Sequence, residues 1–374
     1  MAAHTHGTVS AAPFYLIKEL DRPANVSKIR DVAQHAGVST STVSNVLNGR
    51  SDRMAAETLA RVQAAIAELK YRPNTTARHL KTGHTPLLGL LVPSMANPMY
   101  GAIAREIETQ AQERHGFRVM IGNTYRDVRK EIDFFEDLLA HGIRGVIIIS
   151  SLIDEQHYEV AAQRGLVMVS YDRRATPGSD SIIDHVAVDS FESGRLATQH
   201  LIEQGHRHLA FVTPTGRTMS RNDKIAGFLS AAHAAGLGAS AQVIEGMPVD
   251  EYGDSMMSEL GRMQAGILAG QAHRPTGVIG VNDLMAFGLM AGFRDAGLMV
   301  PRDVSVLGID DVFLSTLMHP AMSSVRLPVP EMAKVMVERV IARLADSSLP
   351  TQEFIFQPTL TVRDSVMPPL LKAL

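Results

Sequence analysis

The stretch IRDVAQHAGVSTSTVSNVLN, residues 29–48, decides the fold of the N-terminal part of this 374-residue chain. Apolar side chains recur every three or four positions at its start, which predicts a helix with one buried face. Ser27 can cap this helix, and Gly37 can end it in a left-handed turn. Ser39 can cap a second helix after a turn of only about three or four residues, the geometry of a helix-turn-helix.

A third helix from about residue 55 is expected to close a small three-helix domain with the first two. Outside its apolar face, the second helix carries Thr40, Ser41 and Asn45, small polar residues that can lie against base edges in the major groove of DNA. Ser44 and the N-terminus of that helix would lie near phosphate. The alternative is that these are ordinary cap and surface residues.

Charge along the chain favours the DNA interpretation. Residues 27–85 hold nine basic and four acidic residues, a net charge of +5, whereas residues 1–26 sum to zero and residues 86–374 carry −8. Affinity for nucleic acid depends on where the basic groups lie and not on the total of −3. A basic head therefore precedes an acidic body.

The runs IRDVAQHAGVSTSTVSNVLNGR and LARVQAAIAELKYRPNTTARHLKTG resemble the DNA-binding head of the lactose/galactose repressor family over nearly sixty positions. The resemblance implies that residues 74–81 form a hinge helix on the operator, with Leu80 wedged into the minor groove and Arg78 nearby. Lys81, like Arg78, would then contribute to the salt dependence of binding. The alternative for Leu80 is a buried linker residue.

Arg50 and Arg53, between the second and third helices, are expected to contact phosphates, with a solvated loop as the alternative. Residues 27–73 are the predicted DNA-binding domain, residues 74–85 the hinge and linker, and residues 1–26 a disordered tail.

Beyond residue 85, apolar runs alternate with amphipathic stretches, which predicts an α/β fold with two open parallel sheets. The runs are LLGLLV (87–92), RVMIG (118–122), GVIIIS (145–150), LVMVSY (166–171), VAVDS (186–190), LAFVT (209–213), TGVIGV (276–281) and VSVLGID (304–310). Glycines are expected to end five of the intervening helices, at Gly116, Gly142, Gly165, Gly205 and Gly297. Ligands in such folds lie beyond the carboxyl ends of the strands.

The family resemblance extends over the body and implies the two-lobed fold of periplasmic sugar-binding proteins, with three crossings between the lobes near residues 185, 312 and 347. The N-terminal lobe would comprise residues 86–185 and 312–346. The C-terminal lobe would comprise residues 186–311 and 347–374.

Within that body, the resemblance places Tyr100 of NPMY in a ligand-stacking loop and assigns Asp283 of VNDLMAFG to sugar or nucleoside hydroxyls. A carboxylate suits a polyol because it accepts two hydroxyl hydrogen bonds. Lys224 stands where the family usually has arginine, and Met99 replaces a usual aromatic. The remaining candidates, which follow strands, are Asn123, Asp172 and Asp189. Asp283 and Asp189 could instead cap helices, and Tyr100 could be a core residue; Asp310 and Asp311 are expected to be structural loop residues.

Several other functions are disfavoured. The sequence has no cysteine, which excludes disulfides, thiol nucleophiles and cysteine zinc sites. It has no GxxxxGK[ST], HExxH or GxSxG motif and no GxGxxG after the first strand. We therefore expect no enzyme activity, no cofactor and no metal site. The histidine-containing run at 205–208, GHRH, is expected to be an exposed turn.

The first 26 residues lack the features of a signal peptide, and no run approaches the roughly 20 apolar residues that span a bilayer. We expect a cytoplasmic protein without membrane contact. The rival is a periplasmic solute-binding protein, against which the basic head argues. The sequence thus predicts a homodimeric transcription regulator, with a higher oligomer left open. Its partners would be a palindromic double-stranded operator and a sugar or nucleoside-like effector.

Overall fold

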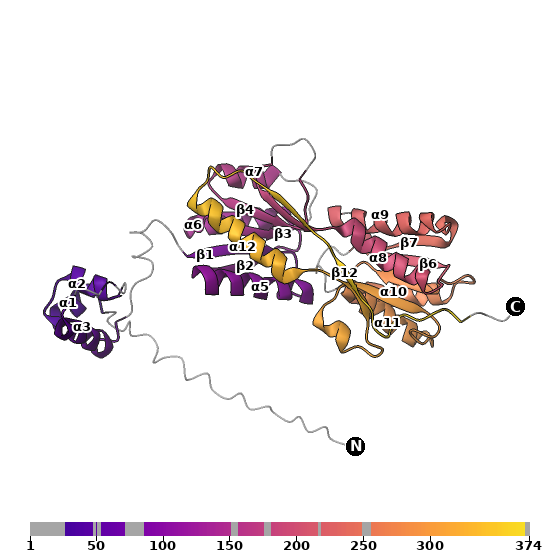
Figure 1. Ribbon diagram of the computed structural model, residues 1–374, viewed down its shortest axis with the longest axis horizontal. Coiled ribbons are helices and arrows are strands. Elements are labelled where there is room, and N and C mark those ends of the chain that lie inside the picture. The colour runs from indigo at the N-terminus through magenta and orange to yellow at the C-terminus, as the bar shows by residue number, and fades with distance from the viewer. Residues whose placement is uncertain are drawn as a thin grey trace, which may run out of the picture. The chain divides into compact units, whose positions relative to one another are not determined.

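The computed structural model describes residues 27–47, 50, 54–71, 86–150, 156–175, 181–215, 218–248 and 256–370. The chain forms two compact units, residues 1–84 and residues 85–374, which we call the head and the body (Figure 1). The tail at 1–26 and the whole of the expected hinge and linker segment at 74–85 lie outside the described residues.

The head contains the three predicted helices, α1 (Ile29–Ala36), α2 (Thr40–Leu47) and α3 (Ala56–Glu68). One residue from each helix, Val32, Val43 and Val62, is fully buried in their shared core. Gly37 ends α1 at φ +63°, as predicted. The predicted cap at Ser27 is wrong: Lys28 is the N-cap residue, and the Ser27 hydroxyl instead donates a hydrogen bond of 3.0 Å to the Leu69 carbonyl beyond α3.

The body consists of two lobes, each built on a six-stranded sheet, and the described strands pair in parallel except for β10 with β12. The first sheet has the order β11-β5-β4-β3-β1-β2 and the second β12-β10-β9-β8-β6-β7. The strands of the first sheet are β1 (Leu87–Val92), β2 (Arg118–Asn123), β3 (Gly145–Ile149), β4 (Val167–Tyr171), β5 (Asp184–Val188) and β11 (Glu353–Phe356). Those of the second are β6 (Leu209–Thr215), β7 (Ala241–Pro248), β8 (Gly277–Gly280), β9 (Ser305–Asp310), β10 (Ser323–Arg326) and β12 (Thr359–Thr361).

Helices cover both faces of the first sheet, because its strands are apolar on both sides. Side chains of α5 (Pro98–His115) and α12 (Val329–Ala345) share one buried cluster with β1, and those of α6 (Val128–Ala140) and α7 (Gln156–Gln163) share another with β3. In Figure 1, α12 lies among elements from the early part of the chain. The second lobe holds α8 (Ser190–Glu203), α9 (Met219–Ala234), α10 (Met257–Ala269), α11 (Asp283–Asp295) and the 3-10 helices η1 (Gly238–Ser240) and η3 (Phe313–Thr316).

The chain passes between the lobes after β5, after β10 and after β11. The sequence predicted crossings near 185, 312 and 347, but β5 still belongs to the first sheet through residue 188 and β10 to the second through residue 326. β11 likewise keeps residues 353–356 in the first lobe. The predicted lobe boundaries were therefore too early. The run at 186–190 was recognised as a strand but assigned to the C-terminal lobe, and the short strands β10 and β11 were not recognised.

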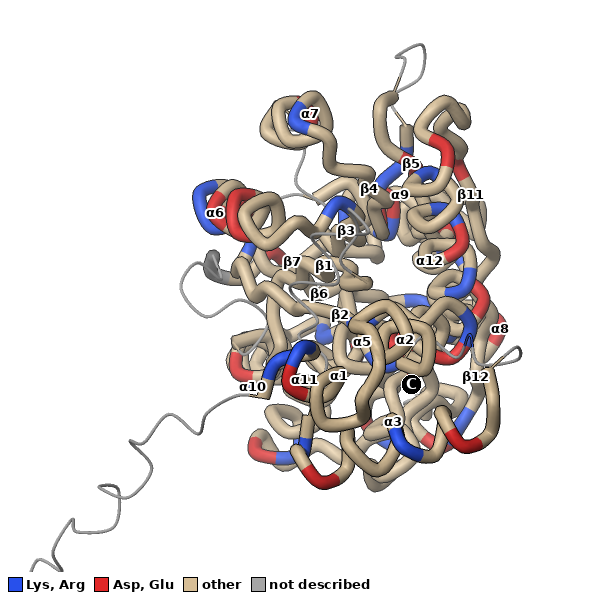
Figure 2. The backbone as a smooth tube through the Cα atoms, turned by 90° about the vertical axis from the view of Figure 1, so that its left-hand side faces the viewer, with Lys and Arg blue, Asp and Glu red and all other residues tan. Residues whose placement is uncertain are grey.

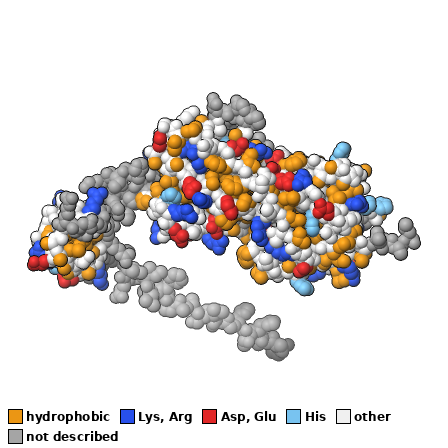
Figure 3. Space-filling view, viewed as in Figure 1, with side chains coloured by type: hydrophobic (Ala, Val, Ile, Leu, Met, Phe, Trp, Pro, Cys, Tyr) orange, Lys and Arg blue, Asp and Glu red, His pale blue; other side chains and the backbone are white. Residues whose placement is uncertain are grey.

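The glycine predictions are confirmed, since Gly116, Gly142, Gly165, Gly205 and Gly297 all have φ between +70° and +96°. Charged residues of both signs are spread over the helices of the body; α6, for example, carries both (Figure 2). Hydrophobic and charged side chains are also interspersed over the face seen in Figure 3. Among the described residues, no helix is long and apolar enough to cross a membrane.

Candidate functional site

The exposed face of α2 carries the residues predicted to read DNA. Thr40, Ser41 and Asn45 are exposed and Ser44 is half-buried, whereas Val43 points into the core of the head. Ser39 caps the helix as predicted, because its Oγ accepts a hydrogen bond of 3.1 Å from the Thr42 amide. Four small polar side chains are thus presented on one capped helix, a surface that can enter a major groove.

Arg50 is exposed just beyond α2, separated from it by two residues that lie outside the described part of the chain. Arg53, Arg78, Leu80 and Lys81 also lie outside the described residues.

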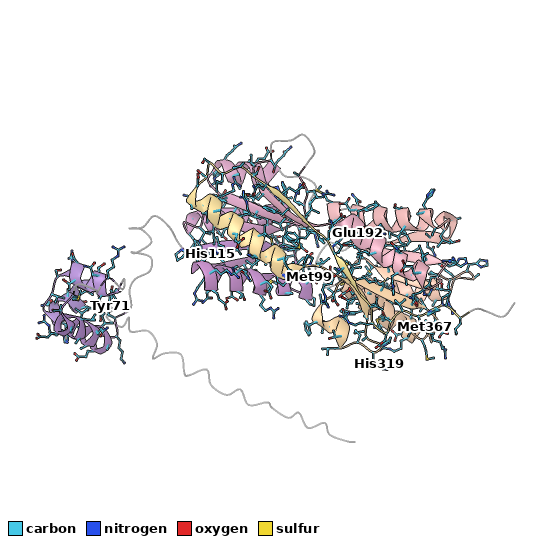
Figure 4. All side chains as sticks on the ribbon, viewed as in Figure 1. Tyr71, Met99, His115, Glu192, His319 and Met367 are labelled. Atoms are coloured by element: carbon cyan, nitrogen blue, oxygen red, sulfur yellow. The ribbon has the colours of Figure 1, made fainter. Side chains whose placement is uncertain are left out.

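A partly open cavity, of about 560 Å³ when the solvent at its mouth is counted, lies between the two lobes of the body, at the carboxyl ends of the strands. Met99, at the start of α5, lies at the junction of the lobes (Figure 4). The cavity is lined by Asn97, Met99, Tyr100, Arg126, Tyr171, Asp172, Val188, Thr218, Ser220, Arg221, Lys224, Met257, Val281, Asn282, Asp310 and Leu327.

Three of the six predicted effector residues, Tyr100, Asp172 and Lys224, meet in this cavity. Asp172 follows β4 in a left-handed conformation, with φ +66°. Burial raises the pKa of its carboxyl group, while the Lys224 ammonium and a hydrogen bond with Ser220 oppose that rise. Asp172 belongs to the first lobe and its two partners to the second, so the carboxylate connects the lobes across the cavity.

The side chains of Lys224 and Tyr100 are each held at the cavity wall by a hydrogen bond to a neighbouring residue. Lys224 Nζ donates a hydrogen bond of 3.3 Å to the Val281 carbonyl. Tyr100 is half-buried and packs against the core of the first lobe, and its hydroxyl accepts a hydrogen bond of 3.0 Å from Arg126 Nη2.

Asn123, Asp189 and Asp283 are not among the lining residues. Asn123 is the half-buried last residue of β2. Asp189 caps α8, accepting a hydrogen bond of 3.0 Å from the Glu192 amide, which agrees with the capping alternative.

The side chain of Asp283 was expected to contact the ligand, but it does not line the cavity. Its carboxylate turns into the second lobe, where it accepts hydrogen bonds from the Val312 amide (2.8 Å), Ser315 Oγ (2.7 Å) and Ser324 Oγ (2.6 Å). Burial raises the pKa of Asp283 to about 6. The preceding residue, Asn282, lines the cavity instead and caps α11 by accepting a hydrogen bond of 2.9 Å from the Met285 amide.

Residues 28–74 match the family model described as bacterial regulatory proteins, lacI family, and residues 198–366 match that of the periplasmic binding protein-like domain. The HTH-type transcriptional regulator GalR of Escherichia coli (strain K12) is 32% identical over 351 residues, which cover 93% of this chain and 98% of that protein. The chain belongs to the lacI family. A match over nearly the whole length to a helix-turn-helix regulator makes this family member a DNA-binding transcription regulator.

Other lacI-family proteins extend the comparison. The HTH-type transcriptional repressor PurR of Aliivibrio fischeri (strain MJ11) is 31% identical, covering 91% of this chain and 99% of that protein. A crystal structure of the lac repressor dimer bound to operator and the anti-inducer ONPF is 26% identical, with a TM-score of 0.77 over 91% of this chain and 99% of that chain. The complex of the transcriptional regulator CelR with cellobiose is also 26% identical, with a TM-score of 0.66 over 91% and 99% of the two chains.

Sequence reasoning did not single out three charged residues that line the cavity of this lacI-family chain, Arg126, Arg221 and Asp310. Arg126 lies in the loop after β2, Arg221 in the first turn of α9 and Asp310 at the end of β9. The available signal was that all three lie at or beyond the end of a strand. Asp310 and Asp311 were both expected to be structural residues, and only Asp311 fits that description. Asp311 accepts hydrogen bonds from Arg326 Nε at 2.7 Å and Thr361 Oγ1 at 3.0 Å, whereas Asp310 lines the cavity. Among the described residues no cluster of three potential metal ligands is found.

Proposed function

We propose that this protein is a homodimeric transcription repressor that reads a palindromic operator through α2. A small polyhydroxylated molecule, sugar-like or nucleoside-like, would control it from the cavity between the lobes. The observation that carries the proposal is the presence, in one lacI-family chain, of an exposed polar face on a capped helix and a two-lobed body with a polar cavity.

Base readout is assigned to Thr40, Ser41 and Asn45. An asparagine amide can bond adenine through two hydrogen bonds, and serine or threonine hydroxyls can donate to or accept from any base edge. Ser44, Arg50 and Arg53 would contact the phosphates. Family membership supports the assignment of Leu80 to the minor groove, with Arg78 and Lys81 at the adjacent backbone.

The dimer follows from the size of the reading surface, because one three-helix head is too small for selective binding and two related heads can read two half-sites. The lac repressor, a relative of 26% identity, is a dimer on its operator. Contacts between the bodies of two copies would set the distance between the heads.

Control by the effector follows from the connection of the lobes through Asp172. A ligand that binds one lobe arrangement better than another shifts the equilibrium between them. Operator affinity then changes by the coupling free energy, typically about 1–3 kcal/mol. The lobe arrangement that the ligand binds better decides whether the ligand weakens or strengthens binding of the protein to its operator. Because the relatives are regulators, we expect the protein to release its ligand without converting it chemically. We expect the protein to act in the cytoplasm, where bacterial DNA lies.

Selection of bound duplexes from a random DNA pool tests the proposal. The full-length protein should select a palindrome, and Asn45→Ala should weaken binding to it by about 1–3 kcal/mol and relax the sequence preference at one position in each half-site. Gln63→Ala, on the exposed side of α3, is the matched control and should leave binding unchanged. Selection of no common sequence would contradict the proposal, as would an unaltered preference in Asn45→Ala.

The hinge assignment has its own test. Leu80→Ala should weaken operator binding more than non-specific binding, while Arg78→Ala and Lys81→Ala should mainly reduce the salt dependence. Unchanged operator affinity in Leu80→Ala would contradict the insertion of Leu80 into the minor groove.

A further inference from the structure

Two consecutive aspartates at the end of β9 have a positive φ, which residues with a Cβ atom adopt only rarely. Asp311, at φ +53°, lies in the left-handed region that aspartate tolerates. Asp310, at φ +126°, lies outside that region, and such strained backbone persists only where the surrounding structure holds it. Asp310 lines the cavity between the lobes, whereas Asp311 is not among the lining residues. The question is therefore what holds the backbone of this cavity residue.

The side chain of Asp311 is buried among polar partners and only 2% exposed. Its carboxylate accepts hydrogen bonds from Arg326 Nε at 2.7 Å and from Thr361 Oγ1 at 3.0 Å. Arg363 Nη2 lies 2.6 Å from the Oδ1 atom of the same carboxylate. The Asp311 amide donates a hydrogen bond of 3.0 Å to Ser324 Oγ. Charge-assisted hydrogen bonds are stronger than neutral ones, so these partners fix both the side chain and the backbone of this residue.

The partners tie the end of β9 to the last part of the chain. Arg326 lies on β10, which pairs with β9, and Thr361 lies on β12, which pairs with β10. Arg363 follows β12, and it donates a hydrogen bond of 2.6 Å from Nη1 to the Met322 carbonyl and one of 2.8 Å from its amide to Ser323 Oγ. Neighbouring strands therefore hold the buried carboxylate from several directions.

We infer that Asp311 is a positioning residue of the effector site. Its bonds to β10 and to the C-terminal stretch hold the end of β9 in the conformation in which Asp310 lines the cavity. Asp310 then offers a carboxylate that can accept hydrogen bonds from hydroxyl groups of the effector. The inference rests on the proposed function and adds to it that residues buried outside the cavity set the affinity for the effector.

Asp184 in the first lobe offers a matched comparison, because its carboxylate is bound in a similar way. It is fully buried and accepts hydrogen bonds from Arg339 Nε at 2.8 Å, Arg343 Nη1 at 3.0 Å and the Gln352 amide at 2.9 Å. Neither Asp184 nor an adjacent residue lines the cavity. Asp184→Asn should therefore lower stability, as Asp311→Asn should, without changing the effector site.

A probe ligand is needed for the test. Thermal shift of the full-length protein at millimolar ligand concentration is measured against neutral monosaccharides, disaccharides and nucleosides, including D-galactose, D-ribose, cellobiose and adenosine. The compound of this set that binds most tightly is the probe.

Titration of the probe into Asp311→Asn and Asp184→Asn then tests the inference. Both variants should unfold at a lower temperature, since each leaves arginines without their carboxylate partner. Asp311→Asn should weaken probe binding by about tenfold or more, whereas Asp184→Asn should leave it within about twofold. An equal effect of the two substitutions on probe affinity, whether a loss or none, overturns the inference.

A double-mutant cycle shows whether Asp311 acts through Asp310. Asp310→Ala should weaken probe binding by about 10- to 100-fold, the loss expected for a hydrogen bond to a charged group. Adding Asp311→Asn to Asp310→Ala should then cause less than about a further twofold loss, because the group that it positions is already absent. Losses that add in the double variant would show that Asp311 acts by another route and would overturn the inference.

Arg326→Gln is a milder variant that keeps the inference testable if Asp311→Asn does not fold. The Arg326 side chain is 57% exposed, so its loss should leave the fold intact. Removal of its bond to Asp311 should weaken probe binding by about two- to fivefold. An unchanged affinity in Arg326→Gln would argue against positioning by this cluster and would overturn the inference.

Failure of the inference and failure of the proposed function give different results. A probe that binds the natural protein and Asp311→Asn equally well removes only the inference. Absence of binding by every sugar and nucleoside tested contradicts the effector class of the proposed function, and selection of no common DNA sequence contradicts its operator.

Discussion

The carboxylate of Asp283 accepts a hydrogen bond from Ser324 Oγ at 2.6 Å, which joins the start of α11 to β10. The same carboxylate accepts hydrogen bonds from the Val312 amide and Ser315 Oγ, near the start of the connection between β9 and β10. It is only 1% exposed. Its neighbour Asn282 lines the cavity, so two adjacent residues at one helix start have different surroundings and different expected roles.

Asp283→Asn should remove a pH dependence of stability. Burial raises the pKa of Asp283 from 3.8 to about 6. The folded state therefore holds its proton more tightly than the unfolded state, and the free energy of unfolding falls as the pH rises from about 4 to about 6, by roughly 3 kcal/mol. Asparagine keeps the three hydrogen bonds, with its oxygen accepting from Val312 and Ser315 and its amide donating to Ser324. Urea unfolding at several pH values should show the slope in the natural protein and not in the variant.

Exchanges at the two adjacent positions should separate support from ligand contact. Asn282→Ala removes the helix cap and a hydrogen-bonding side chain from the cavity wall, so it should weaken effector binding by about tenfold. Asp283→Asn should leave that affinity within about twofold, because its side chain does not line the cavity. Calorimetric titration of both variants measures this. An equal loss in both would contradict the placement of Asp283.

His206 should give a pH dependence of the opposite sign. The sequence placed it in an exposed turn, but it is only 1% exposed and its Nδ1 lies 2.9 Å from Thr276 Oγ1. Burial lowers the pKa of His206 from 6.5 to about 4. Its contribution to stability is present above pH 6.5 and is lost as the pH falls towards 4. His206→Gln should remove this acid-induced loss, which unfolding curves between these pH values would detect; an unchanged slope would contradict burial of the neutral ring.

The strands that could be predicted from sequence are those with continuous apolar runs. All eight predicted runs coincide with strands, from β1 at 87–92 to β9 at 305–310. The four missed strands are short or mixed in composition, such as β10 with SSVR and β12 with TLT. The serines of β10 are buried because their hydroxyls bond other parts of the lobe, Ser324 to Asp283 and Ser323 to the Arg363 carbonyl. Such long-range partners leave no periodic pattern.

The candidate site was predicted in outline and not residue by residue. Polar residues after strands indicated the correct edge of both sheets, and Tyr100, Asp172 and Lys224 line the cavity. A shift of one position at a helix start separates Asn282 from Asp283, and periodicity cannot resolve it. Arg126 and Arg221 lie in stretches after strands but were not singled out, because an arginine in a loop or an amphipathic helix has the same sequence signature whether it faces solvent or a cavity.

Close packing of α8 against α9 should make Gly194→Ala harmful to effector binding. A Cβ atom at Gly194 would lie 2.0 Å from the Lys224 carbonyl oxygen, and one at Gly227 would lie 2.0 Å from the Phe191 carbonyl oxygen. Backbone obstructs both, so a methyl group must push the helices apart. Overpacking of this kind costs about 1–3 kcal/mol of stability.

Because α9 carries Arg221 and Lys224, its displacement in Gly194→Ala should also lower effector affinity, while the exposed residues of α2, in the other compact unit, keep their surroundings. Gly266→Ala is the control: Gly266 lies inside α10, and a methyl group there would meet no atom from outside its own helix within 4 Å, so the same change should be neutral or stabilise by up to about 1 kcal/mol. Thermal unfolding and effector titration of both variants measure the difference. Equal behaviour of the two would show that the α8–α9 contact does not position the cations.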